Sequence, residues 1–315
     1  MKKTYIYSLL TLLIFPFGEI VAQYSQYSSL SRYIGKGHIA ILDSAKTRIS
    51  YSLNYVPDST NLQKVMKDRK VLLIGDEWMH FYSYYVRQAD SAATANVDKG
   101  KTHARFKMPS GVAEEGYEVF THVPTNKRTV LEPITDLSIY RYEEPVETPR
   151  WIISDETCTI LSYPCQKATT RFRGREWTVW FSSAIPLNTG PWKLSGLPGL
   201  ILKATDSKGH YLFECIGIEQ LKKMKQPIIM LQHSSTYVKC TRAEYRKAQK
   251  QFYDNYVNTL LSLGFNVFIE DNSGKMVEFL KTQNTMFEER NVMWGISVNI
   301  ADRYKKTPYN PIELE

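Results

Sequence analysis

The chain has 315 residues, of which 43% are hydrophobic and 23% are charged, and this length allows one large β domain or two smaller ones. No Pro/Ser/Gly-rich linker, internal repeat or low-complexity tract divides it. The net charge of +8 is a mild excess, and the only basic block is residues 221–225. We interpret this charge as a solvated surface and predict no nucleic-acid partner.

The first 22 residues have the features of a secretory signal. Lys2 and Lys3 precede an apolar run over residues 5–17, and the small residue Ala22 follows it. The run is shorter than the ~20 apolar residues that a membrane-spanning helix needs, and no later segment is apolar enough. We predict a cleaved signal peptide (1–22), a single β-rich domain (23–315) without a transmembrane segment, and a periplasmic or secreted protein.

The N-terminal half has strong strand signals. Apolar and polar residues alternate without error over 49–55, which indicates one buried and one wet face. Segments 71–74 and 78–85 flank Gly75-Asp76, a hairpin signal. The polar stretch 86–115 predicts a long loop with one short helix. Further strands are predicted over 117–123, 128–132 and 137–142.

The second half predicts two hairpins and a helix. Strands 165–171 and 176–182 meet across residues 172–175, and strands 200–205 and 210–218 meet across residues 206–209. The sequence Thr241-Arg242-Ala243-Glu244 is a capping box, so we expect a helix to begin there and to end at Gly264. A last strand is predicted over 294–298.

These elements define a fold class. Sequential hairpins require antiparallel pairing, and so large a sheet must curl, split or be covered. We predict a mainly β (α+β) fold with a large, curved, half-barrel-like antiparallel sheet and one long C-terminal helix packed on it. Residues 160–213 resemble the half-open barrel of periplasmic lipoprotein carriers in the order of their hairpins. This is an analogy of fold and does not imply function.

One loop has unusual backbone signals. Leu197-Pro198-Gly199-Leu200 predicts a type II turn, in which Gly199 supplies the positive φ and Gly196 is not required to. Gly190-Pro191-Trp192 is a second turn signal just before it. Two turns and a tryptophan in so short a stretch predict a functional loop or a difficult piece of packing.

The residues of this loop also resemble the motif of a known family. Gly196-Leu197-Pro198-Gly199-Leu200-Ile201 is the motif that names the GLPGLI family of Bacteroidetes exported proteins. Other stretches are similar to that family as well: 163–170, 172–175, 177–181, 185–186 and 310–314. The resemblance is dense over residues 151–218. It implies an exported protein and no mechanism, because the family has no established activity.

The richest aromatic cluster suggests a binding surface. Trp177, Val179 and Phe181 share one strand face and Trp180 takes the other, so both faces must be covered. An ordinary core would explain this; so would an apolar concavity shielded by residues 190–199. The candidate ligand-binding residues are Trp177, Trp180, Trp192, Leu197, Pro198 and Leu200, supported by the turn residues Gly190, Pro191, Gly196 and Gly199.

Few features of the sequence indicate a metal site or a disulfide. The six histidines are scattered without zinc spacing, so we predict no metal and no cofactor. An extended span from Cys158 to Cys165 would hold those two apart unless the chain turns at Tyr163-Pro164. The candidate disulfide is therefore Cys215–Cys240.

No nucleophile elbow or phosphate-binding glycine loop is present, which favours binding over catalysis. We predict a non-enzymatic envelope protein that binds a lipophilic ligand, a peptide or an outer-membrane or envelope partner. Two alternatives remain open. One is a hydrolase whose site assembles from residues distant in sequence, such as His210, Asp206 and a cysteine. The other is a structural subunit of an envelope assembly.

Overall fold

The computed structural model describes residues 39–97, 116–135, 138–221, 226–231, 237–262, 266–270, 275–280, 295–299 and 310–314. The predicted signal peptide, most of the basic block and residues 98–115 of the predicted loop lie outside them. The chain forms two compact units. Residues 29–250 and 308–315 belong to the larger unit, and residues 251–307 to the smaller one. The single-domain expectation stays a prediction.

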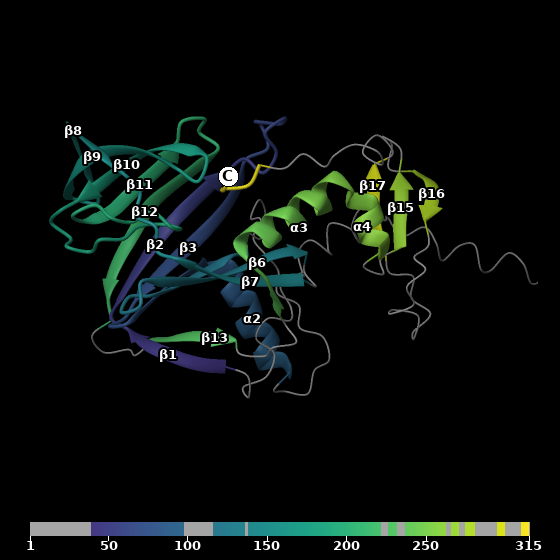
Figure 1. Cartoon of the computed structure of the whole chain (residues 1–315), viewed down its shortest axis with the longest axis horizontal. Helices are drawn as coiled ribbons and strands as arrows, with labels where there is room; N and C mark the ends of the chain where they lie inside the picture. Colours follow the sequence, from purple (N-terminus) through teal and green to yellow (C-terminus); the bar gives the residue numbers. More distant parts are fainter. Residues whose placement is uncertain are drawn as a thin grey trace, which may run out of the picture. The chain divides into compact units, whose positions relative to one another are not determined.

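A 12-stranded sheet dominates the larger unit (Figure 1). Its first half comprises β2 (Thr47–Tyr55), β3 (Met66–Ile74), β4 (Trp78–Ser83), β5 (Glu118–His122), β6 (Lys127–Thr135) and β7 (Ser138–Pro145). Its second half comprises β8 (Ile152–Ile160), β9 (Tyr163–Phe172), β10 (Arg175–Ser182), β11 (Leu200–Asp206) and β12 (Tyr211–Gln220), with β14 (Tyr237–Lys239) at the far edge. The spatial order is β14-β7-β6-β5-β4-β3-β2-β12-β11-β10-β9-β8.

The sheet consists of two antiparallel meanders, β2–β7 and β8–β12, which join where β2 pairs with β12. The sheet is mixed, because β14 pairs parallel to β7. In Figure 1, β6 and β7 run across the direction of β2 and β3, so the sheet curves strongly between them. The predicted fold class, mainly β with a large curved sheet, is confirmed.

The inner face of the sheet carries the main core. On β2 the alternation places Ile49, Tyr51 and Leu53 inside, all with 0% exposure. On β10 it places Trp177 and Phe181 inside as well. The predicted period of two was therefore correct for both strands, because burial of one face selects for alternation.

The outer face is covered by a second layer. β1 (Ile39–Ala45) and β13 (Gln226–Leu231) form a two-stranded antiparallel sheet, and helix α2 (Tyr84–Val97) contacts β3 and β4. Val71 and Leu73 of β3 pack there in a separate cluster with Ile228 and Met230 of β13. This layer covers the outer face at β3 and β4, whereas Trp180, on the outward side of β10, is half-buried.

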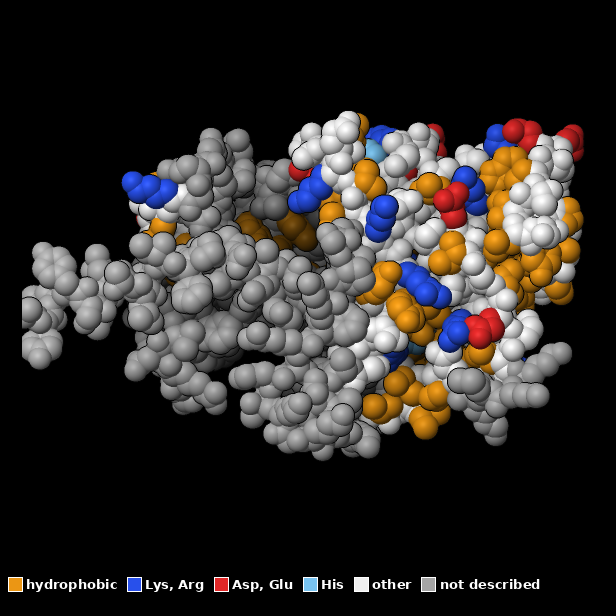
Figure 2. All heavy atoms as spheres, turned by 180° about the vertical axis from the view of Figure 1, so that it is seen from behind, with side chains coloured by type: hydrophobic (Ala, Val, Ile, Leu, Met, Phe, Trp, Pro, Cys, Tyr) orange, Lys and Arg blue, Asp and Glu red, His pale blue; other side chains and the backbone are white. Residues whose placement is uncertain are grey.

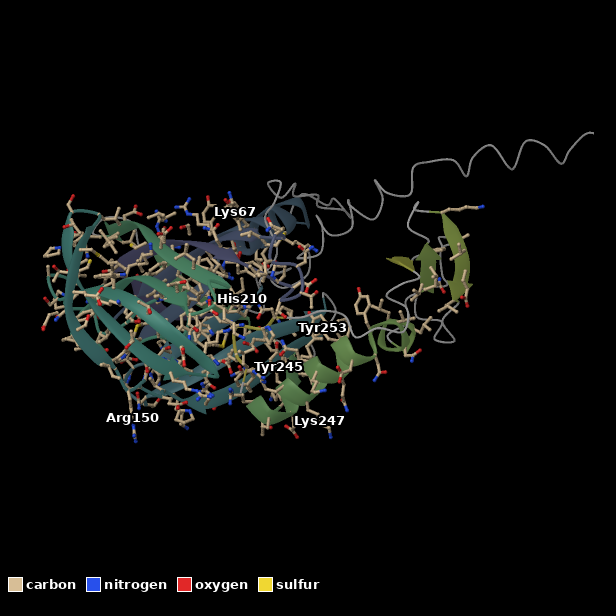
Figure 3. The ribbon with its side chains drawn as sticks, turned by 90° about the horizontal axis from the view of Figure 1, so that it is seen from above. Lys67, Arg150, His210, Tyr245, Lys247 and Tyr253 are labelled. Atoms are coloured by element: carbon tan, nitrogen blue, oxygen red, sulfur yellow. The ribbon has the colours of Figure 1, made fainter. Side chains whose placement is uncertain are left out.

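The capping box is confirmed at the start of helix α3 (Arg242–Asp254). The Glu244 carboxylate accepts the Thr241 N–H at 2.7 Å, and the Thr241 hydroxyl accepts the Glu244 N–H at 3.2 Å. Tyr245 packs its ring on Tyr142 of β7, 5.7 Å between centroids. In Figure 3, Tyr245 points from α3 toward the sheet and Lys247 points away from it.

The smaller unit contains the end of α3, the short helix α4 (Tyr256–Ser262) and a three-stranded sheet. The sheet comprises β15 (Asn266–Glu270), β16 (Met276–Leu280) and β17 (Gly295–Asn299), the last of which corresponds to the predicted final strand. Val267 and Ile269 of β15 are completely buried. None of the helices in the described ranges is long and apolar enough to cross a membrane.

The charge distribution on the reverse face of the molecule is mixed. Figure 2 shows blue and red side chains interspersed with hydrophobic ones over the described part of that face. An interspersed pattern is typical of a solvated surface, whereas a nucleic-acid site gathers positive charge. The expectation that the protein has no nucleic-acid partner stays a prediction.

Candidate ligand-binding site

Residues 183–199, here called the cover loop, connect β10 to β11 and fold over the inner face of the sheet. Backbone hydrogen bonds fix the path of the loop, from Leu200 N to Ile185 O and from Ile201 N to Thr189 O, both 3.0 Å. Trp192 packs its ring on Trp177, 5.7 Å between centroids. The loop is therefore built into the core and does not lie loosely on it.

The predicted type II turn is wrong. The Gly199 N–H donates to the Leu197 carbonyl at 2.8 Å, a three-residue γ-turn centred on Pro198, whose fixed φ suits it. Positive φ occurs at Gly196 (φ 100) and not at Gly199. Gly199 is needed for a different reason, because a Cβ there would lie 2.1 Å from the Ser182 carbonyl oxygen. The backbones approach too closely for any side chain.

A cavity of about 320 Å³ lies between the cover loop and strands β3–β5. Its floor is buried and apolar, with Leu72, Phe81 and Val119 from the sheet and Trp192 and Leu194 from the loop. Its rim includes exposed side chains of three separate segments, namely Val123, Asn126, Thr148 and Asn188. The remaining lining residues are Ile74, Met79, Thr121, Arg128, Val146, Leu187, Thr189, Ser195 and Gly196.

Strand register arranges the sheet wall of this cavity in two rows. The outer row, nearer the rim, runs from Arg128 on β6 through Thr121 on β5 and Met79 on β4 to Ile74 on β3. The inner row follows in the same register order as Val119, Phe81 and Leu72. Residues two apart on a strand are separated by about 7 Å. The wall is therefore apolar throughout except at Thr121 and Arg128.

Arg128 is the charged group of the cavity. Its side chain is buried, and its Nη2 donates to the Lys193 carbonyl at 3.0 Å and to Ser195 Oγ at 3.3 Å. Its Nε and Nη1 have no hydrogen-bond partner among the described residues. Burial lowers the pKa of the guanidinium to about 10, while the charges of Glu144, Glu313 and Glu147 oppose this shift. The group therefore remains protonated at neutral pH.

The other buried cations of the described chain are all paired with carboxylates. Lys70 lies 2.9 Å from Asp68, and Arg175 Nη1 lies 2.7 Å from Asp206 Oδ2. Lys193 Nζ lies 2.8 Å from one oxygen of Glu144. Unpaired buried charges are costly, so such pairing is the rule in folded proteins. Arg128 departs from it, since no ion pair among the described residues involves this side chain.

A buried ion-pair network connects the cover loop to the C-terminal segment 310–314. Lys193 Nζ also lies 2.5 Å from Glu313 Oε1, and the other Glu313 oxygen lies 2.7 Å from Arg242 Nη2 on α3. The Tyr142 hydroxyl accepts a further hydrogen bond from Lys193 at 3.3 Å. The cover loop and residues 310–314 therefore meet through one lysine. Sequence reasoning missed this contact because 120 positions separate the partners.

Arg175 holds the same C-terminal segment to the sheet. Its Nε donates to the Ile312 carbonyl at 2.9 Å, and its Nη2 donates to Asn310 Oδ1 at 2.8 Å. The Asn310 amide in turn donates to the Val56 carbonyl at 2.6 Å. The guanidinium of Arg175 is thus well satisfied, which makes the unmet donors of Arg128 more unusual.

The structure separates the predicted ligand-binding residues. Trp192 and its loop neighbour Gly196 line the cavity. Trp177, Leu197 and Leu200 are buried in the core without lining it, and Trp180 lies half-buried on the other face of β10. Pro198 is exposed, whereas Pro191 and Gly190 are buried in the loop. The predicted binding role of the loop stays a prediction, and most of the apolar residues named for it are buried in the core.

The cysteines differ from the prediction. All four are free, and Cys215 and Cys240 have their Sγ atoms near different carbonyls, those of Gly217 and Arg141. Cys158 instead lies directly opposite Cys165 in the β8–β9 register. The chain reverses just before the proposed position, at residues 161 and 162, which both have positive φ. That reversal invalidates the extended-chain argument against this pair.

Of the candidate hydrolytic residues, Asp206 has its carboxylate engaged in structural contacts. Both oxygens of Asp206 are used, one by Arg175 and one by the Tyr211 N–H at 2.9 Å. The predicted turn is also confirmed, since Gly209 donates to the Asp206 carbonyl at 3.0 Å. His210 is buried, and its carbonyl accepts the Val56 N–H. Within the described ranges, no group of three or more metal-ligating side chains comes together.

Comparison with known proteins gives a partial family match. The family described as "N-glycanase peptide, N-terminal domain" matches residues 134–245, about a third of the chain, which include the cover loop. Two solved structures of PNGF-II, in space groups P21 and C2, are similar at 14% and 13% identity with TM-scores of 0.40 and 0.41. These matches cover 65% and 64% of this chain but only 32% of each of those chains. No curated protein matches the chain.

Proposed function

We propose that the protein is an exported, non-enzymatic binding protein that holds a small lipophilic ligand in the cavity beneath the cover loop. The observation that carries this proposal is the cavity of about 320 Å³ with a buried apolar floor and an exposed rim. Ligand pockets are typically concave, mostly apolar and supplied with few polar groups. The signal-like N-terminus and the GLPGLI resemblance support export.

Ligand entry is proposed at the rim rather than by lifting of the loop. Lys193 anchors the loop through two buried carboxylates, and Gly199 locks its end against Ser182. Opening the loop would expose these charges and break that packing. The exposed rim residues Val123, Asn126 and Asn188 leave a shorter route that requires no such change.

The test compares a blocked cavity with a matched surface change. Val146→Trp places a large side chain at the cavity lining, and Ile152→Trp places the same one at a residue with 72% exposure. Calorimetric titration of residues 23–315 with decanol and decanoate should give saturable binding, weakened about tenfold or more by Val146→Trp alone. Mass spectrometry should recover both ligands unchanged. If neither ligand binds saturably, or if the protein converts one of them chemically, the proposal is contradicted.

A second candidate function is recognition of a glycan-bearing ligand. It is favoured by the match of residues 134–245 to the N-terminal domain of a family named for N-glycanase. Titration with free N-glycans discriminates the two. The second candidate is supported if glycans bind saturably, if Val146→Trp leaves this binding intact, and if neither decanol nor decanoate binds. That result would contradict a lipophilic ligand.

A further inference from the structure

We propose that the cavity selects single-chain amphiphiles with an anionic head group, and that Arg128 contacts this head group. The inference rests on the proposed function, because it assigns the chemistry of the ligand in the same cavity. A carboxylate and a phosphate monoester share this chemistry. The experiment below distinguishes them.

The first argument is the unmet hydrogen-bonding capacity of Arg128. The side chain is 3% exposed and lines the cavity, yet its Nε and Nη1 have no partner among the described residues. A guanidinium carries five N–H donors and keeps its charge. Buried polar groups normally find partners, so each exception needs an explanation. An anionic oxygen in the cavity would supply the missing partner.

The nearby carboxylates are already committed to other cations. Glu144 lies opposite Arg128 in the β6–β7 register, but its two oxygens lie near Lys193 at 2.8 Å and Arg173 at 3.3 Å. Glu313 is likewise shared by Lys193 and Arg242. Two carboxylates are thus shared by three other cations, and neither is left to pair with Arg128.

Trp192 provides an independent observation. The residue lines the cavity, and its buried indole N–H has no acceptor among the described residues. A buried indole N–H usually donates a hydrogen bond. Two residues that line the cavity, one on β6 and one on the cover loop, thus both have buried N–H donors without an acceptor among the described residues.

The position of Arg128 orients the ligand. Arg128 belongs to the outer row of the wall, two residues from Asn126 at the rim. The inner row, with Phe81 and Leu72, is wholly apolar. A head group at Arg128 therefore places its chain over the inner row. A cavity of about 320 Å³ lies at the small end of ligand pockets, which favours a medium-length chain.

Arg128 also holds the cover loop through the Lys193 carbonyl and Ser195 Oγ, so loss of the side chain could loosen the cavity. A structural effect would weaken every ligand to the same extent. Only a head-group contact changes the ratio between anionic and uncharged ligands of equal chain length. The ratio is therefore the measurement.

The experiment uses calorimetric titration of residues 23–315 with four ten-carbon ligands: decanoate, decyl phosphate, decanol and decyltrimethylammonium. The wild-type protein should bind an anionic ligand about tenfold or more tightly than decanol, since hydrogen bonds to charged groups are strong. Decyltrimethylammonium should bind least well. The stronger of decanoate and decyl phosphate identifies the head group.

Three variants locate the contact. Arg128→Met should reduce the preference for the anion to less than about threefold, and Arg128→Lys should restore part of it because the charge returns. Arg150→Met is the matched control, since Arg150 is exposed and points outward in Figure 3. It should leave the preference unchanged.

Equal affinities for decanol and the anions in the wild type would overturn the inference while leaving the proposed cavity function intact. An anion preference that survives Arg128→Met would overturn the role of Arg128. Absence of binding by all four ligands would instead contradict the proposed function itself.

Discussion

Lys193 Nζ lies 2.5 Å from Glu313 Oε1, and both side chains are buried. This pair connects the cover loop to residues 310–314, and through Arg242 it also connects both to helix α3. Removing one partner of a buried pair leaves the other charge uncompensated, which costs far more than loss of a surface pair. The cover loop should therefore depend on Lys193 for its position.

We expect Lys193→Met to lower the free energy of unfolding by about 3 kcal/mol, because it leaves Glu144 and Glu313 without their shared cation. Lys167→Met is the control. Lys167 forms a pair of 2.7 Å with Glu156 on the surface, and its loss should cost less than about 1 kcal/mol. Urea unfolding curves of the two variants provide the comparison. Equal losses would mean that the buried network contributes no more than a surface pair.

Gly199 of the cover loop and Gly209 of the β11–β12 turn should differ in their tolerance of alanine. Gly199→Ala places a methyl group against the Ser182 backbone and should cost more than about 2 kcal/mol. Gly209→Ala meets nothing within 4 Å but has a φ of 66°, so about 1 kcal/mol is expected.

Gly217→Ala is the control for this series, because it meets no neighbour within 4 Å and has no positive φ. Its free energy of unfolding, measured in urea, should stay within about 0.5 kcal/mol of the wild type. A Gly199→Ala protein as stable as the Gly217→Ala protein would contradict the close backbone approach seen at Ser182.

The strands that bury one face were predictable from sequence. β2 and β10 alternate because each has an inner and an outer side, and Gly209 marks a hairpin through its positive φ. β8 was missed because it is an edge strand with an exposed or half-buried residue at every position, so no face imposes alternation. Helix α2 was predicted only as a short helix within a loop, because the aromatic residues at its start favoured a strand.

The candidate site was predictable only in part. The turn residues identified the cover loop, since glycine and proline signals are local. Arg128 was not identified, because the Lys193 carbonyl that it contacts is 65 positions away, and no local pattern distinguishes it from a surface arginine. The same holds for the β3–β5 wall, whose inward residues are ordinary strand residues until the loop closes over them.

Glu132 should make stability depend on pH. Burial, foremost, raises its pKa to about 7 from an ordinary 4.5, with Lys193 opposing and Glu313 adding to the shift. Between pH 4.5 and about 7, the folded protein therefore keeps a proton on Glu132 that the unfolded chain has lost. The stabilising contribution is complete below pH 4.5 and is lost as the pH rises through 7.

Glu132→Gln mimics the protonated side chain, so its stability relative to the wild type should rise between pH 4.5 and 8 by about 3 kcal/mol. Glu143→Gln is the control, because Glu143 is an exposed residue on the neighbouring strand β7, and it should show no such rise. Denaturant titrations at several pH values measure both. A constant difference between Glu132→Gln and the wild type across this range would contradict the raised pKa.

The thiols of Cys158 and Cys165 should form a disulfide under oxidising conditions. They face each other across β8 and β9. Burial, foremost, raises the pKa of Cys165 to about 11, and the nearby Cys158 adds to this shift. Because the thiolate is the reactive form, oxidation by glutathione disulfide should be slow at pH 7 and faster above pH 9. Each bridge transfers two electrons and two protons to the oxidant, giving two reduced glutathione molecules.

Intact mass should fall by two hydrogen atoms, and peptide mapping should place the bridge between residues 158 and 165. Cys158→Ser should abolish it, and Cys215→Ser should not. Because the enclosed loop is short, the bridge should add no more than about 2 kcal/mol to the free energy of unfolding. A bridge mapped to Cys215 and Cys240 would contradict the structure, because these two thiols lie near the carbonyls of different strands, β12 and β7.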